Sequence, residues 1–562
     1  MTEKQHSGNR RSRREFLKAS AAAVAGSQLV SSTEVKAQTP PTLPPRATPG
    51  FDHLVVVMFE NRSLDNLLGY LYEPGELPAG ETFDGLAGKS YSNPSPSGPI
   101  AAHVYTGPTD SIMDSPSPDP GEEYPHVNTQ IFGTVDPPTN AHLNYKKMKA
   151  PYNAPQAGTP EAMQGFVKDY INNYFATQSH APTEKEYAVA MGSFSREMLP
   201  VTSTLARNFA VYDRWFCAVP SQTFCNRSFF HASTSSGFVT NDGKDGYRKW
   251  LDRKLNPATT IFNRLEEKGI PWAVYFDASQ IVSLTGFINA PALEPYWKTH
   301  FRSMTQFYDD ARTGKLPAYS FIEPRLLFDH NDMHPPVATF TFTNAEGKKD
   351  KVGGNSDVRA GEKLLHDIYS AVRTSATPNG SNAMNTLLLV TFDEHGGIHD
   401  HVPPPSAVPP AGLKDTEMDF TFDRLGVRVP AIAISAYTRA GTIIHDEMHH
   451  AAVIATLCEK FGLEPLTARD TGARSLKNAV NLTEPRQSWD WPETTPQYVP
   501  PNPEATGPFT PQAGKAPLTP PGLALMGMLV EKFHLPKDQE PKTYDQAWKL
   551  LQRVGKGLFG GV

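Results

Sequence analysis

Short apolar runs recur along the chain and alternate with segments of helical pattern. Six runs are nearly continuous in Val, Ile, Leu and aromatic residues, which is typical of strands buried on both faces of a parallel sheet. They cover residues 53–59, 209–212, 272–276, 318–322, 386–392 and 431–435. Between them, residues 260–268, 358–375 and 451–461 carry apolar side chains at helical spacing. The alternation predicts an α/β fold with a doubly wound, mostly parallel sheet flanked by helices.

The first 37 residues have the pattern of an export signal. Arg10–Arg14 form a basic stretch, Ala19–Val30 is too short and too mildly apolar to span a bilayer, and Val35–Ala37 offers a cleavage site. Residues 12–18, SRREFLK, match the twin-arginine pattern at every fixed position. We therefore expect a twin-arginine signal peptide over residues 1–37, the twin-arginine export machinery as a partner, and a periplasmic or secreted protein.

The composition of the chain indicates which partners it can have and how its loops are built. The 562 residues include 53 Lys and Arg against 59 Asp and Glu, and this net charge of −6 argues against a nucleic-acid partner. The 52 prolines are about twice the usual share and predict long, stiff loops on a compact body. We expect a catalytic domain over residues 38–491 and a Pro-rich C-terminal wrap over residues 492–562 that packs on it.

The chain has three cysteines, Cys217, Cys225 and Cys458, so at most one disulfide can form. The spacing of Cys217 and Cys225 is not a zinc signature, and buried, unreactive thiols are the better interpretation, although a Cys217–Cys225 pair stays open.

Two of the most apolar predicted strands end in oxygen-bearing side chains. The first is followed by Glu60 and Asn61, and the strand 386–392 is followed by Asp393 and Glu394. Ligand sites in such sheets lie beyond the carboxyl ends of the strands, so these groups are expected at one edge. Packed acids repel one another unless a cation lies among them, and carboxylate and amide oxygens suit a divalent metal. Solvated acids at strand ends are the alternative.

A third segment, Val219–Arg227, follows the strand 209–212 and carries hydroxyl groups in a loop before a helix. A metal lowers the pKa of a hydroxyl and makes it a usable nucleophile, and Asn226 and Arg227 offer donors for phosphate oxygens. Ser and Thr in a loop beside a proline are also common as simple turn residues.

These residues together resemble the phosphoesterase family of bacterial and plant phospholipases C and acid phosphatase A, within the alkaline-phosphatase-like superfamily. The resemblance covers most of the mature chain, and its ordered set of motifs is highly specific. The matching segments are HLVVVMFENRSLD (53–65), PSQTFCNR (220–227), NDMHP (331–335), TFDEHGGIHDHVPPP (391–405), HAAVIATL (450–457) and LTARD (466–470). The resemblance implies an alkaline-phosphatase-like fold.

The resemblance also implies roles for individual residues. It implies one divalent metal site, of unspecified identity, held by Glu60, Asn61, Asp393 and Glu394. Thr223 corresponds to the nucleophile that forms a phosphoryl-enzyme. His334 corresponds to a histidine near the leaving group, and Asp400 and His401 have supporting or structural roles.

The chain departs from the family pattern at the phosphate-contacting positions. Many relatives have a histidine where this chain has Glu122, and His126 falls four residues later, so either one is a candidate substrate contact beside Asn226 and Arg227. Ser221 replaces a family glycine and is a rival nucleophile to Thr223.

The leading interpretation is an exported, metal-dependent phospholipase C that acts on glycerophospholipids through a phosphothreonine and touches membranes peripherally. A broad acid phosphatase acting on phosphomonoesters is the alternative within the enzymes. A non-catalytic exported binding protein is disfavoured because the set Glu60–Asn61, Thr223 and Asp393–Glu394 is intact. The substrate headgroup and the oligomeric state stay open.

Overall fold

The computed structural model describes residues 42–107, 109–243, 245–336, 339–343, 349–353, 357–413, 415–497 and 513–560. The chain divides into two units, Met1–Thr42 and Leu43–Val562. The expected signal peptide lies outside the described residues, so the architecture below is that of the second unit. None of the helices among the described residues is long and apolar enough to cross a membrane.

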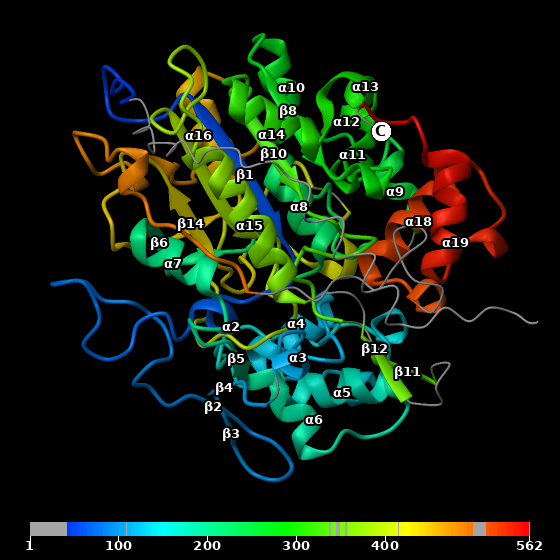
Figure 1. The fold of residues 1–562 in the computed structure, drawn as a ribbon. Helices are drawn as coiled ribbons and strands as arrows, with labels where there is room; N and C mark the ends of the chain where they lie inside the picture. The colour runs from blue at the N-terminus through cyan, green and yellow to red at the C-terminus, as the bar shows by residue number, and fades with distance from the viewer. Residues whose placement is uncertain are drawn as a thin grey trace, which may run out of the picture. The chain divides into compact units, whose positions relative to one another are not determined.

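An eight-stranded sheet forms the centre of the second unit (Figure 1). Its strands, in spatial order, are β15 (Thr442–Ile444), β6 (Ala210–Tyr212), β14 (Ala431–Ile434), β13 (Thr386–Phe392), β1 (His53–Phe59), β10 (Tyr319–Glu323), β8 (Trp272–Phe276) and β9 (Phe301–Ser303). All neighbours pair in parallel except β14, which is antiparallel to both β13 and β6. The predicted α/β class and mostly parallel sheet are confirmed. The short strands β9 and β15 are not apparent in the apolar pattern, because three-residue runs are too short to show a period.

Helices cover both faces of this sheet. On one face, ring contacts join Phe321 of β10 to Phe230 of α8, and Trp272 of β8 to Phe262 of α10. On the other face, Tyr275 of β8 contacts Phe307 of α14. Because successive side chains of a strand point to opposite faces, these contacts define two helical layers. The first contains α8 (Thr223–Ala232), α10 (Ile261–Glu267) and α16 (Ala451–Phe461), and the second contains α7 (Pro200–Asn208), α14 (Met304–Thr313) and α15 (Val358–Arg373).

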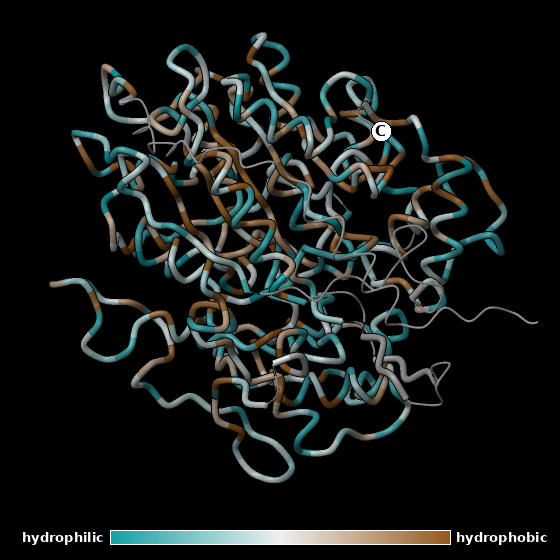
Figure 2. Tube along the Cα trace, in the orientation of Figure 1, coloured by the Kyte–Doolittle hydropathy of each residue, from teal (hydrophilic) through white to brown (hydrophobic). Residues whose placement is uncertain are grey.

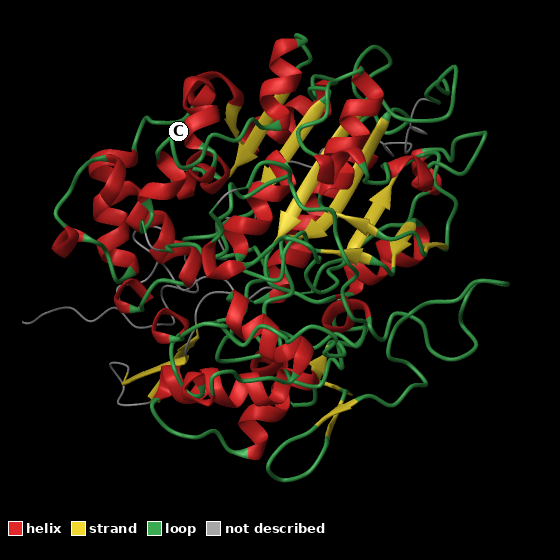
Figure 3. Ribbon diagram, turned by 180° about the vertical axis from the view of Figure 1, so that it is seen from behind, coloured by secondary structure: helices red, strands yellow, loops and turns green. Residues whose placement is uncertain are grey.

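The sheet strands are apolar because they are covered on both faces. Every residue of β13 and all of β1 after its first residue are buried. Figure 2 shows the hydrophobic positions following the strands through the interior, and Figure 3 shows the strands side by side with helices around them. The three cysteines are free and buried in this core, so Cys217 and Cys225 do not pair.

A second group of elements, here called the cap segment (residues 92–193), lies at the end of the sheet where β1 stops (Figure 1). It contains β2 (Ser92–Asn93), β3 (Ile100–Ala101), β4 (His103–Val104), α3 (Thr109–Ile112), α4 (Tyr124–Phe132), α5 (Phe166–Gln178), α6 (Glu184–Ala188) and β5 (Gly192–Ser193). Helix α2 (Leu64–Leu68) follows β1 and adjoins β5. The cap segment has its own small apolar core, which includes Val127, Phe166 and Tyr170.

The remaining elements extend the edges of the fold. They are α9 (Arg248–Leu251), α11 (Leu284–Ile288), α12 (Ala290–Leu293), α13 (Trp297–His300) and α17 (Ala468–Thr471), with the pair β7 (Trp215–Phe216) and β16 (Met448–His449) and the hairpin β11 (Thr339–Thr343) and β12 (Lys349–Gly353). Near the C-terminus, α18 (Pro520–Lys532) contacts α9, and α19 (Tyr544–Leu550) begins at Tyr544, which hydrogen-bonds His330 at 3.0 Å. Phe559 packs against Phe287 and Trp297.

Candidate active site

Strands β1 and β13 bring four polar side chains to one place. The two strands are adjacent and parallel, with Phe59 paired to Phe392, so the residues that follow them lie side by side. The backbone N–H of Asn61 donates to Asp393 Oδ1 at 3.1 Å. Asn61 has a φ of 56°, a left-handed conformation that asparagine tolerates better than most residues, and it turns the chain out of the strand. The predicted meeting of Glu60, Asn61, Asp393 and Glu394 at the carboxyl edge is what the structure shows.

Helix α8 adds a hydroxyl and a guanidinium to this edge. Thr223 is the first residue of α8, and Arg227 lies one turn further along the same helical face. Arg227 Nε donates to Asp393 Oδ2 at 3.1 Å, and its Nη2 lies 3.2 Å from Glu60 Oε1. Arg227 therefore ties α8 to both strand ends and brings the start of this helix, with Thr223, to the same edge of the sheet.

Several oxygens in this group make no hydrogen bond within the described residues, although one of them, Glu60 Oε1, lies in the ion pair with Arg227. Glu60, Asn61, Thr223, Asp393 and Glu394 are all fully buried. Among the described residues, five of their side-chain oxygens accept or donate no hydrogen bond: Glu60 Oε1 and Oε2, Asn61 Oδ1, Thr223 Oγ1 and Glu394 Oε1. Buried polar atoms are nearly always paired, and a cluster of oxygens without hydrogen-bond partners has the chemistry of a site for a divalent cation. We call these five residues the oxygen cluster, and its donors fit a divalent metal.

The electrostatics of the oxygen cluster point the same way. Burial, together with the charge of Asp393, raises the pKa of Glu60 well above its ordinary value. Burial raises the pKa of Asp393 as well, and burial together with the charges of Glu122 and Asp393 raises that of Glu394. One guanidinium does not balance three buried carboxyl groups, and a divalent cation would.

Tight turns and one histidine hold the second strand end in place. Gly396 has a φ of 64°, and a Cβ at this position would lie 2.4 Å from the backbone oxygen of Asn61, so only glycine fits. Its N–H donates to Glu394 Oε2 at 2.6 Å, which leaves Oε1 for the site. His450 Nε2 lies 2.6 Å from the carbonyl oxygen of Asp393, and the imidazole fixes that backbone.

The loop before α8 orders the nucleophile position. Asn226 donates to the carbonyl oxygens of Ser221 at 2.6 Å and Val219 at 3.2 Å, and accepts from the N–H of Val219 at 3.0 Å. The hydroxyl of Ser221 donates to the carbonyl oxygen of Val239. The amide of Asn226 thus shapes the loop, and Ser221 is occupied with the backbone while Thr223 Oγ1 is not.

The predicted substrate contacts divide between two places. Asn61 Nδ2 donates to Glu122, whose other oxygen accepts from Gln222 Nε2 at 3.3 Å, so Glu122 lies beside the oxygen cluster. Burial raises the pKa of Glu122 to about 8. His126 instead pairs with Asp169 at 2.8 Å inside the cap segment, where burial lowers its pKa but the charge of Asp169 raises it more, to about 9. Arg227 contacts Glu60 and Asp393, as described above.

His334 reaches the site from the segment that follows β10. Its Nδ1 lies 2.6 Å from the carbonyl oxygen of Pro335, and its Nε2 lies 3.1 Å from Asn61 Nδ2. These contacts favour the tautomer in which Nδ1–H donates to the carbonyl oxygen and Nε2 accepts a hydrogen bond from the amide of Asn61. Burial lowers the pKa of His334 to about 4. Its role as a proton donor to the leaving group stays a prediction.

Asp400 and His401 belong to a second cluster on the same edge. Arg428 donates to Asp400 at 2.9 Å and to Asp65 at 3.1 Å, and His401 lies 2.7 Å from Asp65 and 3.1 Å from Asp84. We call these five residues the ion-pair cluster. Its three acids face Arg428 and His401, and Lys89 pairs with Asp84 at 2.9 Å, which is consistent with the structural role expected for Asp400 and His401.

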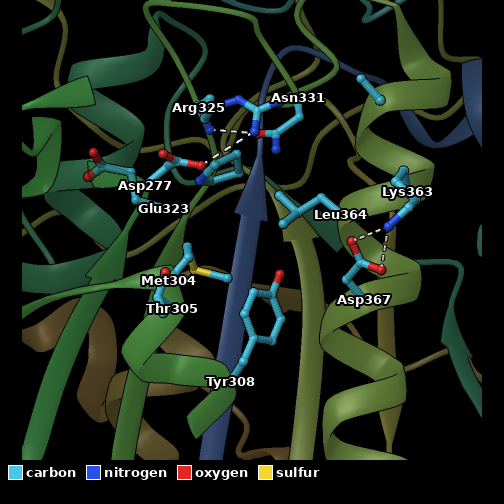
Figure 4. Close-up of a pocket in the computed structure, with 12 residues that line it drawn as sticks. Asp277, Met304, Thr305, Tyr308, Glu323, Arg325, Asn331, Lys363, Leu364 and Asp367 are labelled. Atoms are coloured by element: carbon cyan, nitrogen blue, oxygen red, sulfur yellow. Dashed lines mark hydrogen bonds and ion pairs between the residues drawn. The ribbon is translucent and has the colours of Figure 1, made fainter. Parts of the chain in front are cut away.

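A cavity of about 400 Å³ lies beyond the carboxyl ends of β8 and β10, against α14 and α15 (Figure 4). Its charged side chains have partners: Arg325 pairs with Asp277 at 3.3 Å, and Lys363 pairs with Asp367. Glu323 accepts from the N–H groups of Leu284 and Thr285 at the start of α11. With these groups paired, the cavity offers no reactive side chain comparable to Thr223.

The sequence interpretation gave no role to Asp119, which lies beside the oxygen cluster, or to Asp65, Asp84 and Arg428 of the ion-pair cluster. Asp119 lies beside His334, with Oδ2 at 3.9 Å from Nε2, and it stands in the same short segment as Glu122. The position of Asp119 in this segment is the sequence signal from which its place near the site could have been predicted. Arg428 has no comparable signal, because it lies in a loop before β14 and only the fold brings it to Asp65 and Asp400.

The geometry of this site indicates the class of protein to which the chain belongs. A buried threonine begins a helix that Arg227 ties to buried carboxylates, at the carboxyl edge of a mostly parallel α/β sheet. This arrangement is typical of hydrolases that transfer a phosphoryl group to a hydroxyl with the help of a metal.

Comparison with known proteins identifies the family. The model of the phosphoesterase family matches residues 51–464. The chain is 34% identical over 462 residues to non-specific phospholipase C3 of Arabidopsis thaliana, with 79% of this chain and 76% of that protein covered. It is 25% identical over 339 residues to phospholipase C B of Mycobacterium tuberculosis, with 54% and 59% covered. The protein belongs to the phosphoesterase family, as its motifs predicted, and is a hydrolase acting on phosphoester bonds.

Solved structures give a weaker likeness. A protein of the alkaline phosphatase superfamily from Vibrio parahaemolyticus matches with 12% identity and a TM-score of 0.27, covering 54% of this chain and 77% of that one.

Proposed function

We propose that this protein is a metal-dependent phospholipase C that cleaves glycerophospholipids through a phosphothreonine at Thr223. The observation that carries the proposal is the oxygen cluster, in which Thr223 Oγ1 is buried without a partner beside three acids. The names of the plant and mycobacterial relatives support the choice of phospholipid as substrate.

Glu60, Asn61, Asp393 and Glu394 would hold the metal, with Thr223 Oγ1 facing it. When bound, a divalent cation supplies positive charge that lowers the pKa of the threonine hydroxyl and offsets the charge of the phosphate oxygens. Thr223 Oγ1 then attacks phosphorus, so that the Oγ–P bond forms and the bond from phosphorus to the glycerol oxygen breaks. The glycerol oxygen takes up the proton that the Thr223 hydroxyl releases and leaves as diacylglycerol, while the headgroup phosphate stays on Oγ1. Water then attacks phosphorus and the Oγ–P bond breaks, so that a proton from water restores the hydroxyl and the phosphorylated headgroup is released.

Other residues position these atoms. Arg227 holds Glu60 and Asp393 in place, and Asn226 keeps the loop that leads into α8. The N-terminus of α8 carries a partial positive charge that favours an alkoxide or a phosphate beside Thr223. Because Thr223 is fully buried and Glu122 of the cap segment contacts Asn61 and Gln222 beside it, we infer that the cap segment moves to admit a lipid.

The test is an assay of purified mature protein against phosphatidylcholine, phosphatidylethanolamine and p-nitrophenyl phosphate, before and after exhaustive chelation. Release of diacylglycerol that is lost on chelation and restored by a divalent metal is the expected result. Phosphomonoester hydrolysis without diacylglycerol would replace the proposal with an acid phosphatase. Full activity in protein shown by elemental analysis to be free of metal would remove the metal from the mechanism.

We also propose export by the twin-arginine pathway to the periplasm or the medium, which rests on residues 12–18. Replacing Arg13 and Arg14 together by lysine keeps the charge and removes the recognised pair. We expect the full-length precursor to accumulate in the cytoplasm, and unchanged export of this variant would point to another route.

A further inference from the structure

A second group of ligand-type side chains lies next to the oxygen cluster. Asp119, Glu122 and His334 each offer one ligand atom, and these atoms all lie within 4.8 Å of one another. His334 Nε2 is 3.9 Å from both Asp119 Oδ2 and Glu122 Oε2. Their side chains are 7%, 3% and 0% exposed in the order Asp119, Glu122, His334, so the group is almost closed to solvent.

The orientation of His334 is that of a metal ligand. Ligating histidines commonly donate their other ring N–H to a carbonyl or a carboxylate, which fixes the tautomer and directs the free lone pair at the metal. His334 Nδ1 makes this bond, at 2.6 Å, to the carbonyl oxygen of Pro335. Its Nε2 lone pair faces two carboxyl groups, an unfavourable arrangement unless something positive lies among them.

Neither carboxyl group forms an ion pair with an arginine or a lysine among the described residues, where each pairs only with His334, at 3.9 Å. The charge of the buried Arg62 lowers the pKa of Asp119, but less than burial and the charge of Glu122 raise it, and the pKa stays well above its ordinary value. Asp119 Oδ1 is buried and has no hydrogen-bond partner in the described part of the chain. In the ion-pair cluster a guanidinium pairs with the carboxylates. In the group of Asp119, Glu122 and His334, Asn61 Nδ2 supplies only an amide dipole to Glu122 and His334.

We propose that Asp119, Glu122 and His334 form a second divalent-cation site, separate from the oxygen cluster and joined to it through Asn61. Two carboxylates with one imidazole suit Mn²⁺ or Zn²⁺ better than Ca²⁺ or Mg²⁺, which prefer oxygen alone. The enclosure favours a bare ion over an organic ammonium group. Binding exchanges the hydrogen bond between Asn61 and His334 for a bond from Nε2 to the ion, while Asn61 Oδ1 stays with the oxygen cluster.

A cation held there would place positive charge on the side of the site where His334 faces the leaving group. This consequence rests on the proposed function, because it needs a phosphoester bound at Thr223. The binding proposal itself depends only on the three side chains.

The experiment counts bound metal in the mature protein. Chelated protein is titrated with Mn²⁺ by calorimetry, and the number of sites is checked by electron paramagnetic resonance, for the wild type and for Glu122→Gln, Asp393→Asn and Glu123→Gln. Glu123 is the matched control, because it adjoins Glu122 but pairs with His126 at 3.8 Å. We expect about two Mn²⁺ per chain in the wild type and the control, and about one in each of the other two variants.

Two results would overturn the second site. Wild-type protein that binds one Mn²⁺, lost in Asp393→Asn and kept in Glu122→Gln, leaves the proposed function standing without this site. The second site is also overturned if the wild type and Glu122→Gln bind the same number of Mn²⁺ ions per chain. If Glu122→Gln fails to fold by circular dichroism, Asp119→Asn replaces it, with the same expected loss of one ion.

Discussion

Two clusters of acids at the same edge of the sheet differ in how their charge is balanced. Each receives one acid from the segment after β1 and another from the segment after β13: Glu60 and Asp393 enter the oxygen cluster, and Asp65 and Asp400 enter the ion-pair cluster. Arg428 lies between Asp65 and Asp400 and contacts both.

The balance of charge separates a structural cluster from a reactive one. In the ion-pair cluster the three carboxylates face a guanidinium and a histidine, and Lys89 pairs with the third acid, Asp84. In the oxygen cluster one guanidinium faces three acids, and five oxygens make no hydrogen bond among the described residues. Proximity of acids is therefore a poor sign of a metal site by itself, and the absence of a compensating base is the informative feature.

The largest effect should come from the nucleophile. Thr223→Ala removes the attacking oxygen, and we expect kcat on phosphatidylcholine to fall by roughly three orders of magnitude or more, with an unchanged circular dichroism spectrum. Ser221→Ala is the matched control and should lose less than about tenfold, because that hydroxyl serves only the loop. A Thr223→Ala enzyme near wild-type activity, with Ser221→Ala inactive, would move the nucleophile to Ser221.

The second-largest effect should be on metal affinity, which we expect to depend on the oxygen cluster and not on the ion-pair cluster. Asp393→Asn removes a charge from the oxygen cluster, and we expect metal affinity to fall by about two orders of magnitude, measured by calorimetry on the chelated protein. Asp400→Asn makes the equivalent change in the ion-pair cluster and should leave affinity at the oxygen cluster unchanged. Equal losses in both variants would contradict the distinction between the clusters.

The same clusters should respond in opposite ways when stability is measured without metal. Asp65→Asn breaks a buried pair with Arg428 and should lower the free energy of unfolding by about 3–5 kcal/mol. Glu60→Gln removes one of several repelling acids and should leave that free energy unchanged or raise it. Urea denaturation of the chelated proteins measures both, and a large loss in Glu60→Gln would show that its pairing with Arg227 outweighs the repulsion.

The smallest effect concerns pH. Burial lowers the pKa of His401, but its bonds to Asp65 and Asp84 raise it more, to about 9. The stability contributed by protonated His401 is fully present below its unfolded pKa of about 6.5 and is lost as the pH rises through about 9. Melting temperature should therefore decline over this range, and decline less in His401→Gln. An identical pH dependence in the two proteins would contradict this assignment.

Much of the fold follows from local pattern. The bounds of β1, β8, β13 and α16 agree with the sequence prediction residue for residue, because strands covered on both faces are apolar throughout and α16 keeps an apolar face against the core. The position of Glu60, Asn61, Asp393 and Glu394 at one edge follows from the rule that parallel strands end together. These features depend on neighbours in sequence and on the parallel direction of the sheet.

What only the tertiary structure decided is which charges are balanced. The sequence supplies Asp65, Asp400 and Arg428 at distant positions, and nothing in their spacing reveals that they meet. It likewise placed Arg227 among the expected phosphate contacts, whereas the fold turns its guanidinium toward Glu60 and Asp393. Electrostatic pairing depends on distances of a few ångströms between segments far apart in the chain, so the sequence by itself determined the chemistry available at this edge, and the folded arrangement determined which acids are left for a metal.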